Sequence, residues 1–596
     1  MKEDMKMKCK KGLLIAAGAL VCLGAVPASA AIIGASASPT PVEIPAGSII
    51  YAADGSEYSR LNLFSTDSYG KPADLFAREN SSLITWIGCL FGGSGSISEK
   101  LAEVLIPDCA ASEKISAAKF LEQTYTHEEL ASLFCSSLEF ADGVYGLENA
   151  ASYYFGCAPS ALNDEQLRAL VEINRSEKYR SMSVQELSEQ SCFGELEFSS
   201  NSACPRLFGS DYATETVRQL RSVLTEQGKT PEEADRMIFC SGLEIHTPLD
   251  TASQAVLDKE IGNQKDPGTF QIAMQIMDYK GNVVASIGGI GKKNRVDRTQ
   301  KTLSPGSSIK PLSVYAPAIE EGLINYSSIL PDRPFLPEKE WPQNYDHIYD
   351  QSVTAAKAIR RSKNTSPMFL ADKLTSYKCF SYLLHGGFTH LDASDDSLMS
   401  MSLGYMESGV TVCEMNAAYA AFGNGGLYYP PTFITSVELN GETLYQYSGE
   451  PVRMYSDETA WIMNRLLESN VRLPDGLGVG ARLDNTEVFG KTGTTDKNSV
   501  VDNNWFVGGT PEKVAAVWIG LDDQSFNSGM ASNTRLWNLI MSQIECGTDK
   551  FTPALGTVCL EFCTESGGLA AEGCESTETG WYVPENIPDK CQLHSQ

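Results

Sequence analysis

Two groups of predicted strands, separated by a long helical block, constrain the fold of this chain more than any other feature. Alternating hydrophobic residues and short apolar runs mark the strands. They lie at 243–247, 270–277 and 283–287 before the block, and near Lys491, at 504–509 and at 514–521 after it. Lys280-Gly281-Asn282 predicts a hairpin turn between two of them. With helical patterns dominating from 311 to about 422, both ends of the segment should build one sheet in an α+β domain.

The chain is too long to be this domain alone. It has 596 residues, whereas a single hydrophobic core stops growing at roughly 250 to 300 residues. Helical spacing in 112–138 and 147–154, and a Glu, Arg and Leu-rich stretch at 214–237, predict an α-rich first domain. We expect four segments: a signal peptide or anchor at 1–35, the α-rich domain at 47–240, the α+β domain at 241–545 and a cysteine-rich tail at 546–596.

The first thirty residues have the features of an export signal. Lysines precede an apolar run at 12–26, and Ala28-Ser29-Ala30 supplies the small residues that a signal peptidase accepts. The run is shorter than the roughly 20 residues that a spanning helix needs, although 31–35 could extend it. A cleaved signal peptide and a retained membrane anchor both fit. Either one places the rest of the chain on the extracytoplasmic face of the cell membrane.

Charge and histidine content exclude several function classes. The net charge of −28 opposes a nucleic-acid partner, because polyanions bind to basic surfaces. No two of the six histidines have the helical i, i+4 spacing, beside a carboxylate, of a metalloprotease helix. We therefore predict no metal and no cofactor in the chemistry of this protein.

Sixteen cysteines in an exported chain make disulfides plausible, although their number does not give the pairing. Five of them crowd the C-terminal tail, at Cys546, Cys559, Cys563, Cys574 and Cys591. A small tail stapled by disulfides is the favoured interpretation. A zinc site there is less favoured, because only His594 offers an imidazole ligand.

Ser307 and Lys310 form a Ser-x-x-Lys pattern that places a hydroxyl and an amine one helical turn apart on the same face. A lysine in a water-poor site loses its proton near neutral pH and can then activate the serine. The same pattern also begins at Ser68 and Ser116. Ser-x-Asn is equally common, at Ser362, Ser199 and Ser525, so neither pattern alone identifies a site.

Order and context single out Ser307, because Lys491-Thr492-Gly493 occurs once and follows Ser307 and Ser362 in the order that Ser-x-x-Lys acyltransferases require. The sequence here resembles the class A, bifunctional penicillin-binding proteins, and the likeness covers roughly 240–545. Further matching stretches lie at 305–311, 402–404, 415–426, 489–495 and 504–511. The resemblance implies a lysozyme-like, α-rich glycosyltransferase-type domain followed by an α+β penicillin-binding, β-lactamase-like transpeptidase domain with an antiparallel sheet flanked by helices.

The resemblance also implies a role for each motif residue. Ser307 attacks the carbonyl between the last two D-alanines of a peptidoglycan stem peptide, and Lys310 takes its proton. Ser362 relays a proton to the departing amine, and Asn364 holds Lys310 and a substrate amide. The implied substrate-binding residues on the opposite wall are Lys491, Thr492, Gly493 and Thr494. Lys491 supplies positive potential, the two threonines bind the substrate carboxylate, and Gly493 leaves room for the substrate backbone. The backbone N–H groups of Ser307 and Thr494 are the expected oxyanion hole.

Residues 90–180 resemble the glycosyltransferase domain of the same family, at 93–102 and 144–156. Its catalytic motifs are damaged. Only Glu79-Asn80 faintly matches the family's E-D-x-x-F-x-x-H, and R-K-I-x-E is replaced by Glu113-Lys114-Ile115-Ser116-Ala117. Loss of a basic phosphate-binding residue and a carboxylate removes substrate affinity and catalysis. We expect the fold to be kept and glycosyl transfer to be lost, which would require a separate glycan polymerase as partner.

Two alternatives remain open from the sequence. The same three motifs also build D,D-carboxypeptidases and serine β-lactamases, which hydrolyse the acyl-enzyme. A non-catalytic penicillin-binding scaffold is the second alternative, although the intact motifs oppose it. In every case the expected ligands are peptidoglycan stem peptides and β-lactams.

Overall fold

The computed structural model describes residues 39, 41–61, 96–106, 109–141, 144–157, 159–193, 196–198, 210–264, 270–290, 296–497, 500–521, 532–544, 547 and 550–594. The predicted signal peptide or anchor at 1–35 lies outside these residues. Among the described residues, no helix has both the length and the apolarity needed to cross a membrane.

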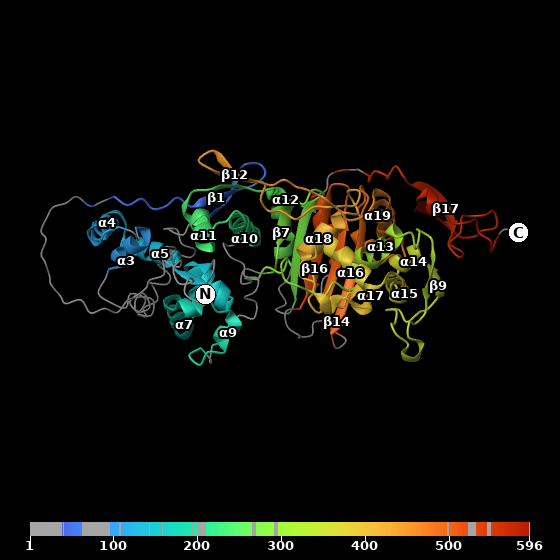
Figure 1. The fold of residues 1–596 in the computed structure, drawn as a ribbon, viewed down its shortest axis with the longest axis horizontal. Coiled ribbons are helices and arrows are strands. Elements are labelled where there is room, and N and C mark those ends of the chain that lie inside the picture. Colours follow the sequence, from blue (N-terminus) through green and yellow to red (C-terminus); the bar gives the residue numbers. More distant parts are fainter. Residues whose placement is uncertain are drawn as a thin grey trace, which may run out of the picture.

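A five-stranded antiparallel sheet forms the centre of the predicted α+β domain (Figure 1). In the order β14-β15-β16-β6-β7, its strands are Phe489–Lys497, Val500–Gly509, Lys513–Gly520, Gln271–Asp278 and Val283–Ile287. β6 and β16 pair from Gln271 opposite Gly520 to Asp278 opposite Lys513. The sheet therefore joins both ends of the domain, and the predicted hairpin of β6 and β7 is confirmed.

Helices cover both faces of this sheet, because alternate residues of a strand point to opposite sides. On β16, Val514, Ala516 and Trp518 join the core that includes α18 (Val412–Ala420), whereas Ala515, Val517 and Ile519 pack with α12 (Thr251–Gly262) and α20 (Asn533–Ile544). β14 is the edge strand. The motif Lys491-Thr492-Gly493 therefore lies on an edge strand of the sheet.

The helical block is confirmed with one departure. Its further helices are α13 (Ala316–Glu320), α14 (Ala355–Arg360), α15 (Thr365–Leu374), α16 (Ser376–His385) and α17 (Leu398–Leu403), and α19 (Asp457–Arg472) follows later in the chain. The departure is a hairpin of β8 (Ile329–Asp332) and β9 (Gln351–Thr354) within the block. A short pair of strands, β10 (Leu427–Tyr428) and β13 (Val452–Arg453), closes the region.

A second five-stranded sheet combines segments that lie far apart in the sequence. Its order is β12-β11-β5-β1-β2, formed by Glu442–Gln446, Ser436–Leu439, Glu244–His246, Ser48–Tyr51 and Glu57–Leu61. β1 runs parallel to β5, and β11 pairs with the other side of β5. The expectation that 47–240 is mostly helical is therefore wrong for 48–61, which form a hairpin of β1 and β2 that β5 of the other domain joins to the sheet.

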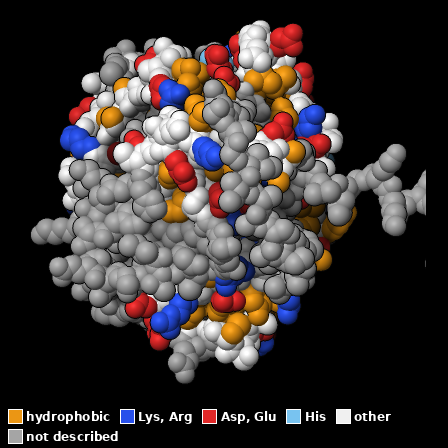
Figure 2. Space-filling view, turned by 90° about the vertical axis from the view of Figure 1, so that its left-hand side faces the viewer, with side chains coloured by type: hydrophobic (Ala, Val, Ile, Leu, Met, Phe, Trp, Pro, Cys, Tyr) orange, Lys and Arg blue, Asp and Glu red, His pale blue; other side chains and the backbone are white. Residues whose placement is uncertain are grey.

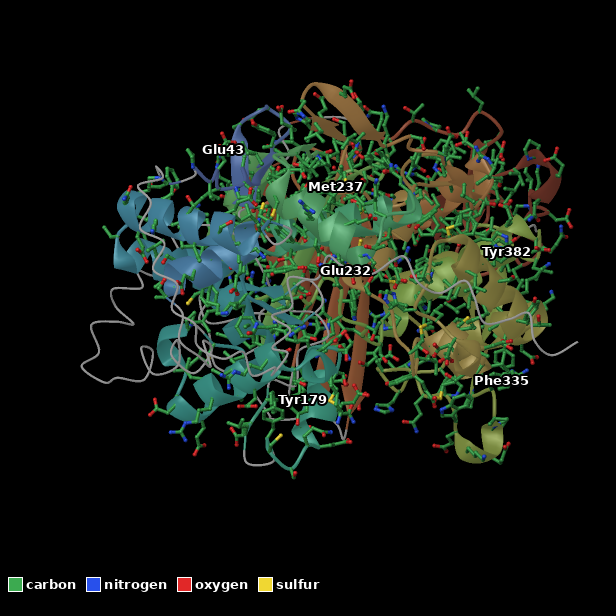
Figure 3. All side chains as sticks on the ribbon, turned by 60° about the vertical axis from the view of Figure 1, so that its left-hand side comes forward. Glu43, Tyr179, Glu232, Met237, Phe335 and Tyr382 are labelled. Atoms are coloured by element: carbon green, nitrogen blue, oxygen red, sulfur yellow. The ribbon has the colours of Figure 1, made fainter. Side chains whose placement is uncertain are left out.

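Two helices pack on this shared sheet. α10 (Asp211–Glu226) and α11 (Pro231–Cys240) share a hydrophobic core with β1, β5 and β11. In Figure 3, Glu232 and Met237 mark α11, which lies between the helical unit that carries Tyr179 and the helices that carry Tyr382. The predicted boundary at 240 falls inside this connecting layer, directly before β5.

The rest of the first domain is a helical unit with two small cores. Its helices are α3 (Ile97–Leu105), α4 (Ala111–Thr124), α5 (His127–Ser137), α6 (Gly146–Phe155), α7 (Asp164–Arg175), α8 (Glu177–Arg180) and α9 (Val184–Ser188). A short hairpin of β3 (Glu139–Ala141) and β4 (Val144–Tyr145) interrupts them. The α-rich prediction is confirmed for this unit.

The C-terminal tail contains a hairpin of β17 (Val558–Cys563) and β18 (Thr577–Tyr582) at the far end of the molecule (Figure 1). The structure joins none of the cysteines that it describes in a disulfide. Cys546 lies outside the described residues. The expectation of a disulfide-stapled tail is therefore not met by Cys559, Cys563, Cys574 or Cys591.

Candidate active site

Ser307 lies in a tight turn at the start of a helical segment. Gly306–Ile309 forms a 3₁₀ helix, and a π-helical stretch at 311–315 leads into α13. Ser307 is half-buried, whereas Ser308, Ile309 and Lys310 are buried. Gly306 has a φ of +54°, which residues with a Cβ rarely adopt. The turn therefore leaves Ser307 as its accessible side chain.

Three glycines bring this turn against two other segments. A Cβ on Gly306 would lie 2.6 Å from the carbonyl oxygen of Thr494. A Cβ on Gly404 would overlap the carbonyl group of Gly306, whose amide donates to the Gly404 carbonyl at 3.2 Å. A Cβ on Gly493 would overlap the carbonyl oxygen of Pro305. The turn is thus packed directly on strand β14.

The reason for glycine at position 493 differs from the prediction. We expected the missing side chain to leave room for the substrate backbone. An added Cβ would instead overlap Pro305 and lie 2.7 Å from the Ser308 hydroxyl oxygen. That expectation is corrected, because the space beside Gly493 is filled by the turn that carries Ser307.

Lys310 is 1% exposed, and oxygens of the Ser362-Lys363-Asn364 motif surround its amino group. Its Nζ donates to Asn364 Oδ1 at 2.7 Å and to the Lys363 carbonyl at 2.9 Å. A longer contact of 3.5 Å reaches the Ser362 carbonyl. The predicted pairing of Lys310 with Asn364 is therefore present. Among the described residues, none forms a hydrogen bond with the Ser307 hydroxyl.

Ser362 contacts both lysines of the site. The Nζ of Lys491 donates to Ser362 Oγ at 2.8 Å and to the Thr492 carbonyl at 2.9 Å, while the Ser362 carbonyl faces Lys310. Ser362 follows α14 with a φ of +51°, a conformation that costs a residue with a Cβ about 1–3 kcal/mol. The surrounding contacts hold this strained residue between the two amines.

Both lysines have strongly shifted protonation equilibria. Burial, reinforced by the positive charge of Lys491, lowers the pKa of Lys310 well below the ordinary value for lysine. Burial alone lowers the pKa of Lys491 to about 7. A buried ammonium group loses hydration, which favours its neutral form. Lys310 can therefore be a neutral base at a pH where Lys491 still carries charge.

A buried acidic network beneath the second motif was missed by sequence reasoning. Lys363, between Ser362 and Asn364, is 2% exposed and forms an ion pair with Asp332 at 2.9 Å. Burial raises the pKa of Asp332, but hydrogen bonds from the Asp350 amide and from other neighbours outweigh it and lower the pKa overall. The remaining neighbours that donate to Asp332 are Thr365 and Asn344. Lys363 is the only signal in the sequence, and its acidic partner lies 31 residues earlier in the chain.

Side chains alternate along β14 at the predicted substrate-binding motif. Lys491 faces Ser362, and Gly493 faces the turn that carries Ser307. Thr492 is half-buried and Thr494 is exposed. The two threonine hydroxyls therefore lie on the accessible side of an edge strand, next to the turn that carries Ser307.

Of the competing patterns, the one at Ser116 falls within the described residues. Ser116 is half-buried and Lys119 exposed on α4, in the helical unit. The other competing serines, Ser68, Ser199 and Ser525, lie outside the described residues.

The damaged motif of the first domain can be located in part. Glu113 caps the N-terminus of α4 by accepting the Ala110 amide at 2.9 Å. Ala117, at the position of the family's second acid, is fully buried in a hydrophobic core. Glu79 and the glycines at 93 and 95 lie outside the described residues. On the described surface that faces the viewer in Figure 2, acidic and basic side chains are interspersed.

Comparison with family models finds two matches in the expected order. Residues 92–192 match the family described as transglycosylase. Residues 264–542 match the family described as penicillin binding protein transpeptidase domain, and this segment contains the three motifs.

Several curated proteins are similar over long stretches. Penicillin-binding protein 1A of Clostridium tetani is 28% identical over 80% of this chain, and penicillin-binding protein 1F of Bacillus subtilis is 28% identical over 71%. Penicillin-binding protein 1A of Clostridium acetobutylicum is 32% identical over 55%. The chain spans 69%, 62% and 44% of the lengths of these relatives, respectively.

Solved structures share the fold. Penicillin-binding protein 1A from Haemophilus influenzae aligns with 93% of this chain and all of its own, at a TM-score of 0.58 and 17% identity. The PonA1 protein from Mycobacterium tuberculosis, solved in complex with penicillin V, aligns with 58% of this chain and 96% of its own, at a TM-score of 0.51 and 23% identity.

The two lysine pKa values predict a bell-shaped pH profile for acylation of Ser307 by a fluorescent penicillin. At low pH, protonated Lys310 cannot accept the serine proton, so the second-order rate constant should rise as pH increases. Above about 7, Lys491 loses its charge and attraction for the penicillin carboxylate, so the rate constant should fall. Stopped-flow measurement from pH 5 to 9 tests this profile. A rate that still rises through pH 9, unchanged by Lys491→Ala, would contradict it.

Gly493→Ala should separate the nucleophile turn from β14, because the new Cβ overlaps Pro305. A displacement of about 1 Å in a reacting group costs roughly a hundredfold in rate. We expect penicillin acylation to fall by about that factor. The matched control is Gly262→Ala on α12, where an added Cβ meets nothing within 4 Å. Equal acylation rates in both variants would contradict the claim that close packing of the Ser307 turn on β14 requires glycine at position 493.

Proposed function

The chain belongs to the class A penicillin-binding proteins, and from this premise we propose that Ser307 is the acylated nucleophile of a serine-type D-Ala-D-Ala transpeptidase. Its residues 264–542 are a penicillin-binding transpeptidase domain, which belongs to peptidoglycan cross-linking in cell-wall synthesis. One observation carries the assignment of the site. Lys310 and Lys491, both 1% exposed, meet the Ser362–Asn364 motif at hydrogen bonds of 2.7 and 2.8 Å.

The proposed acylation begins with neutral Lys310. It takes the hydroxyl proton of Ser307 as Oγ attacks the carbonyl carbon between the last two D-alanines of a stem peptide. The resulting oxyanion accepts hydrogen bonds from the amides of Ser307 and Thr494, which are worth about 10²–10³-fold in rate per donor. The C–N bond then breaks, and the terminal D-alanine leaves after its nitrogen gains a proton.

Ser362 is suited to deliver that proton. Its hydroxyl accepts a hydrogen bond from Lys491 and can donate its own proton towards the leaving nitrogen. Ser362 then takes up the proton that Lys310 removed from Ser307, so that Lys310 is neutral again. Lys491 also supplies positive potential for the terminal carboxylate of the substrate, whose oxygens the hydroxyls of Thr492 and Thr494 bind. Asn364 fixes Lys310 through Oδ1, while its Nδ2 donates to the Gln343 carbonyl at 2.8 Å.

Deacylation completes the cross-link. An amine of a neighbouring stem peptide attacks the acyl-enzyme carbonyl and gives a proton to Lys310, which passes it to Ser307 Oγ as the ester bond breaks. A new amide bond then joins the two stems. Water in place of the amine would give a trimmed peptide, as in a D,D-carboxypeptidase or a β-lactamase. A β-lactam acylates Ser307 in the same way, but its opened ring stays attached and blocks the acceptor.

We also infer that glycosyl transfer is lost from the first domain. The inference is supported by Ala117, which fills a hydrophobic core where the family's second acid would stand, and by Glu113, which caps α4. A separate glycan polymerase would then supply the strands, and the helical unit would serve as a scaffold or docking element. The site of action is the extracytoplasmic face of the cell membrane, with the N-terminal segment as signal or anchor.

Ser307→Ala should abolish covalent labelling by a fluorescent penicillin, measured by gel fluorescence and intact-protein mass. The matched control is Ser116→Ala, which changes the competing Ser-x-x-Lys pattern in α4 and should label normally. In the unmodified protein the penicillin adduct should last much longer than the time that a β-lactamase needs to hydrolyse its own acyl-enzyme. Rapid release of the opened penicillin would support the hydrolytic alternative, and labelling of Ser307→Ala would refute the assignment.

The purified full chain should not polymerise the lipid-linked disaccharide precursor of peptidoglycan. Fluorescent precursor would remain monomeric on a gel, while a class A relative tested in parallel forms glycan chains. When polymer from that relative is added, the chain should cross-link it through Ser307. Formation of glycan chains by this protein alone would refute the loss of glycosyl transfer.

A further inference from the structure

Three cysteines and one histidine of the C-terminal tail converge on one point. The sulfur atoms of Cys563, Cys574 and Cys591 and a ring nitrogen of His594 all lie within 4.8 Å of one another. Cys563 is fully buried and Cys591 is 1% exposed, whereas Cys574 and His594 are half-buried. The four residues come from the end of β17, the loop before β18 and the last turn of the described chain.

The distances fit a tetrahedral metal centre. His594 Nδ1 lies 3.5 Å from Cys563 Sγ and 3.4 Å from Cys591 Sγ. Zinc with Zn–S bonds of about 2.3 Å and Zn–N bonds of about 2.0 Å separates neighbouring S and N ligand atoms by roughly 3.6 Å. A disulfide would bring two sulfur atoms to about 2.05 Å. The histidine contacts therefore have the spacing of two ligands on one ion.

The other ring nitrogen of His594 has the partner that a zinc-bound histidine needs. Its Nε2 lies 3.5 Å from Glu565 Oε2. Metal-binding histidines commonly donate their second N–H group to a carboxylate, which fixes the tautomer and the ring orientation. With Nδ1 directed at the sulfur atoms and Nε2–H at Glu565, the imidazole is oriented as a ligand.

The backbone around the cluster is folded tightly. The Ala571 amide donates to Cys574 Sγ at 3.3 Å, and the Cys563 amide and carbonyl pair with Gly568 and Gly567. A Cβ on Gly573 would overlap the carbonyl oxygen of His594, so the chain must pass closely at this point. Such turns preorganise ligands that are distant in the sequence.

We propose that Cys563, Cys574, Cys591 and His594 bind a structural zinc ion. Three thiolates and one imidazole with no open position are a closed, structural ligand set, and soft thiolates select zinc over magnesium or calcium. Binding displaces the thiol protons to solvent and requires no oxidant. A disulfide between two of these cysteines would consume an oxidant and leave the third thiol beside the imidazole.

The zinc ion would fix the tail against the active-site domain. The Gly567 carbonyl, between the first two ligands, accepts the Ser327 hydroxyl at 2.6 Å. Glu578 of β18 forms two hydrogen bonds, at 2.9 and 3.0 Å, with Arg360, the last residue of α14. Ser362 follows two residues later. The tail that the ion would fix therefore contacts α14, the helix that leads into Ser362.

Metal analysis of the full chain, purified anaerobically and incubated with Zn²⁺ before desalting, tests the proposal. We expect one zinc ion per chain by elemental mass spectrometry, and no disulfide among the three cysteines in peptide maps made without reductant. Cys591→Ser should lose the ion. The matched control is Cys559→Ser, which removes an exposed cysteine of β17 outside the cluster and should retain it.

Two further measurements keep the test decisive if Cys591→Ser fails to fold. Co²⁺ bound to the unmodified chain should give the visible absorption of tetrahedral thiolate coordination. Glu565→Gln should weaken zinc binding about 10- to 100-fold in chelator competition, as expected for a carboxylate that orients a ligand. A chain that binds neither Zn²⁺ nor Co²⁺, or that contains a disulfide between two of the cluster cysteines, would overturn the proposal.

Discussion

The active site depends on keeping two amines out of water without neutralising them by carboxylates. In the described structure, Lys310 and Lys491 donate only to neutral oxygens, those of Ser362, Lys363, Asn364 and Thr492. A carboxylate beside either amine would stabilise the ammonium form and raise its pKa. The acidic groups are instead held one layer below, where Asp332 pairs with Lys363. This separation leaves Lys310 available as a base.

That arrangement requires three segments to pack closely: the turn of Ser307, the motif that begins at Ser362, and strand β14. Gly306 and Gly493 allow the turn that carries Ser307 to pack on the edge strand β14. Ser362, which lies between the two lysines, adopts an unfavourable positive φ. The buried ion pair of Lys363 with Asp332 holds the backbone next to Ser362 in place. Packing of the turn, strand and helix therefore determines the chemistry as much as the identity of the reacting groups does.

The sequence predicted the central sheet because its strands are long and buried on both faces, as on β16. The three motifs were found because their order is specific. β1 and β2 were missed because they are short and because β5, the strand that joins their hairpin to the rest of the sheet, lies about two hundred residues away. The acidic partner of Lys363 and the true neighbours of Gly493 are long-range contacts without a local pattern. The ligand spacing in the tail matches no short zinc motif, so the cysteines favoured disulfides.

The shared sheet also determines how the molecule carries mechanical load. The chain enters through β1, makes an excursion through the helical unit, and returns through β5, which lies parallel to β1. Tension applied at the N-terminus against the sheet domain pulls these two strands in opposite directions along their length. Their hydrogen bonds then share the load in shear instead of opening one by one. The helical unit lies between β1 and β5 in the sequence, so it stays outside the path of this load.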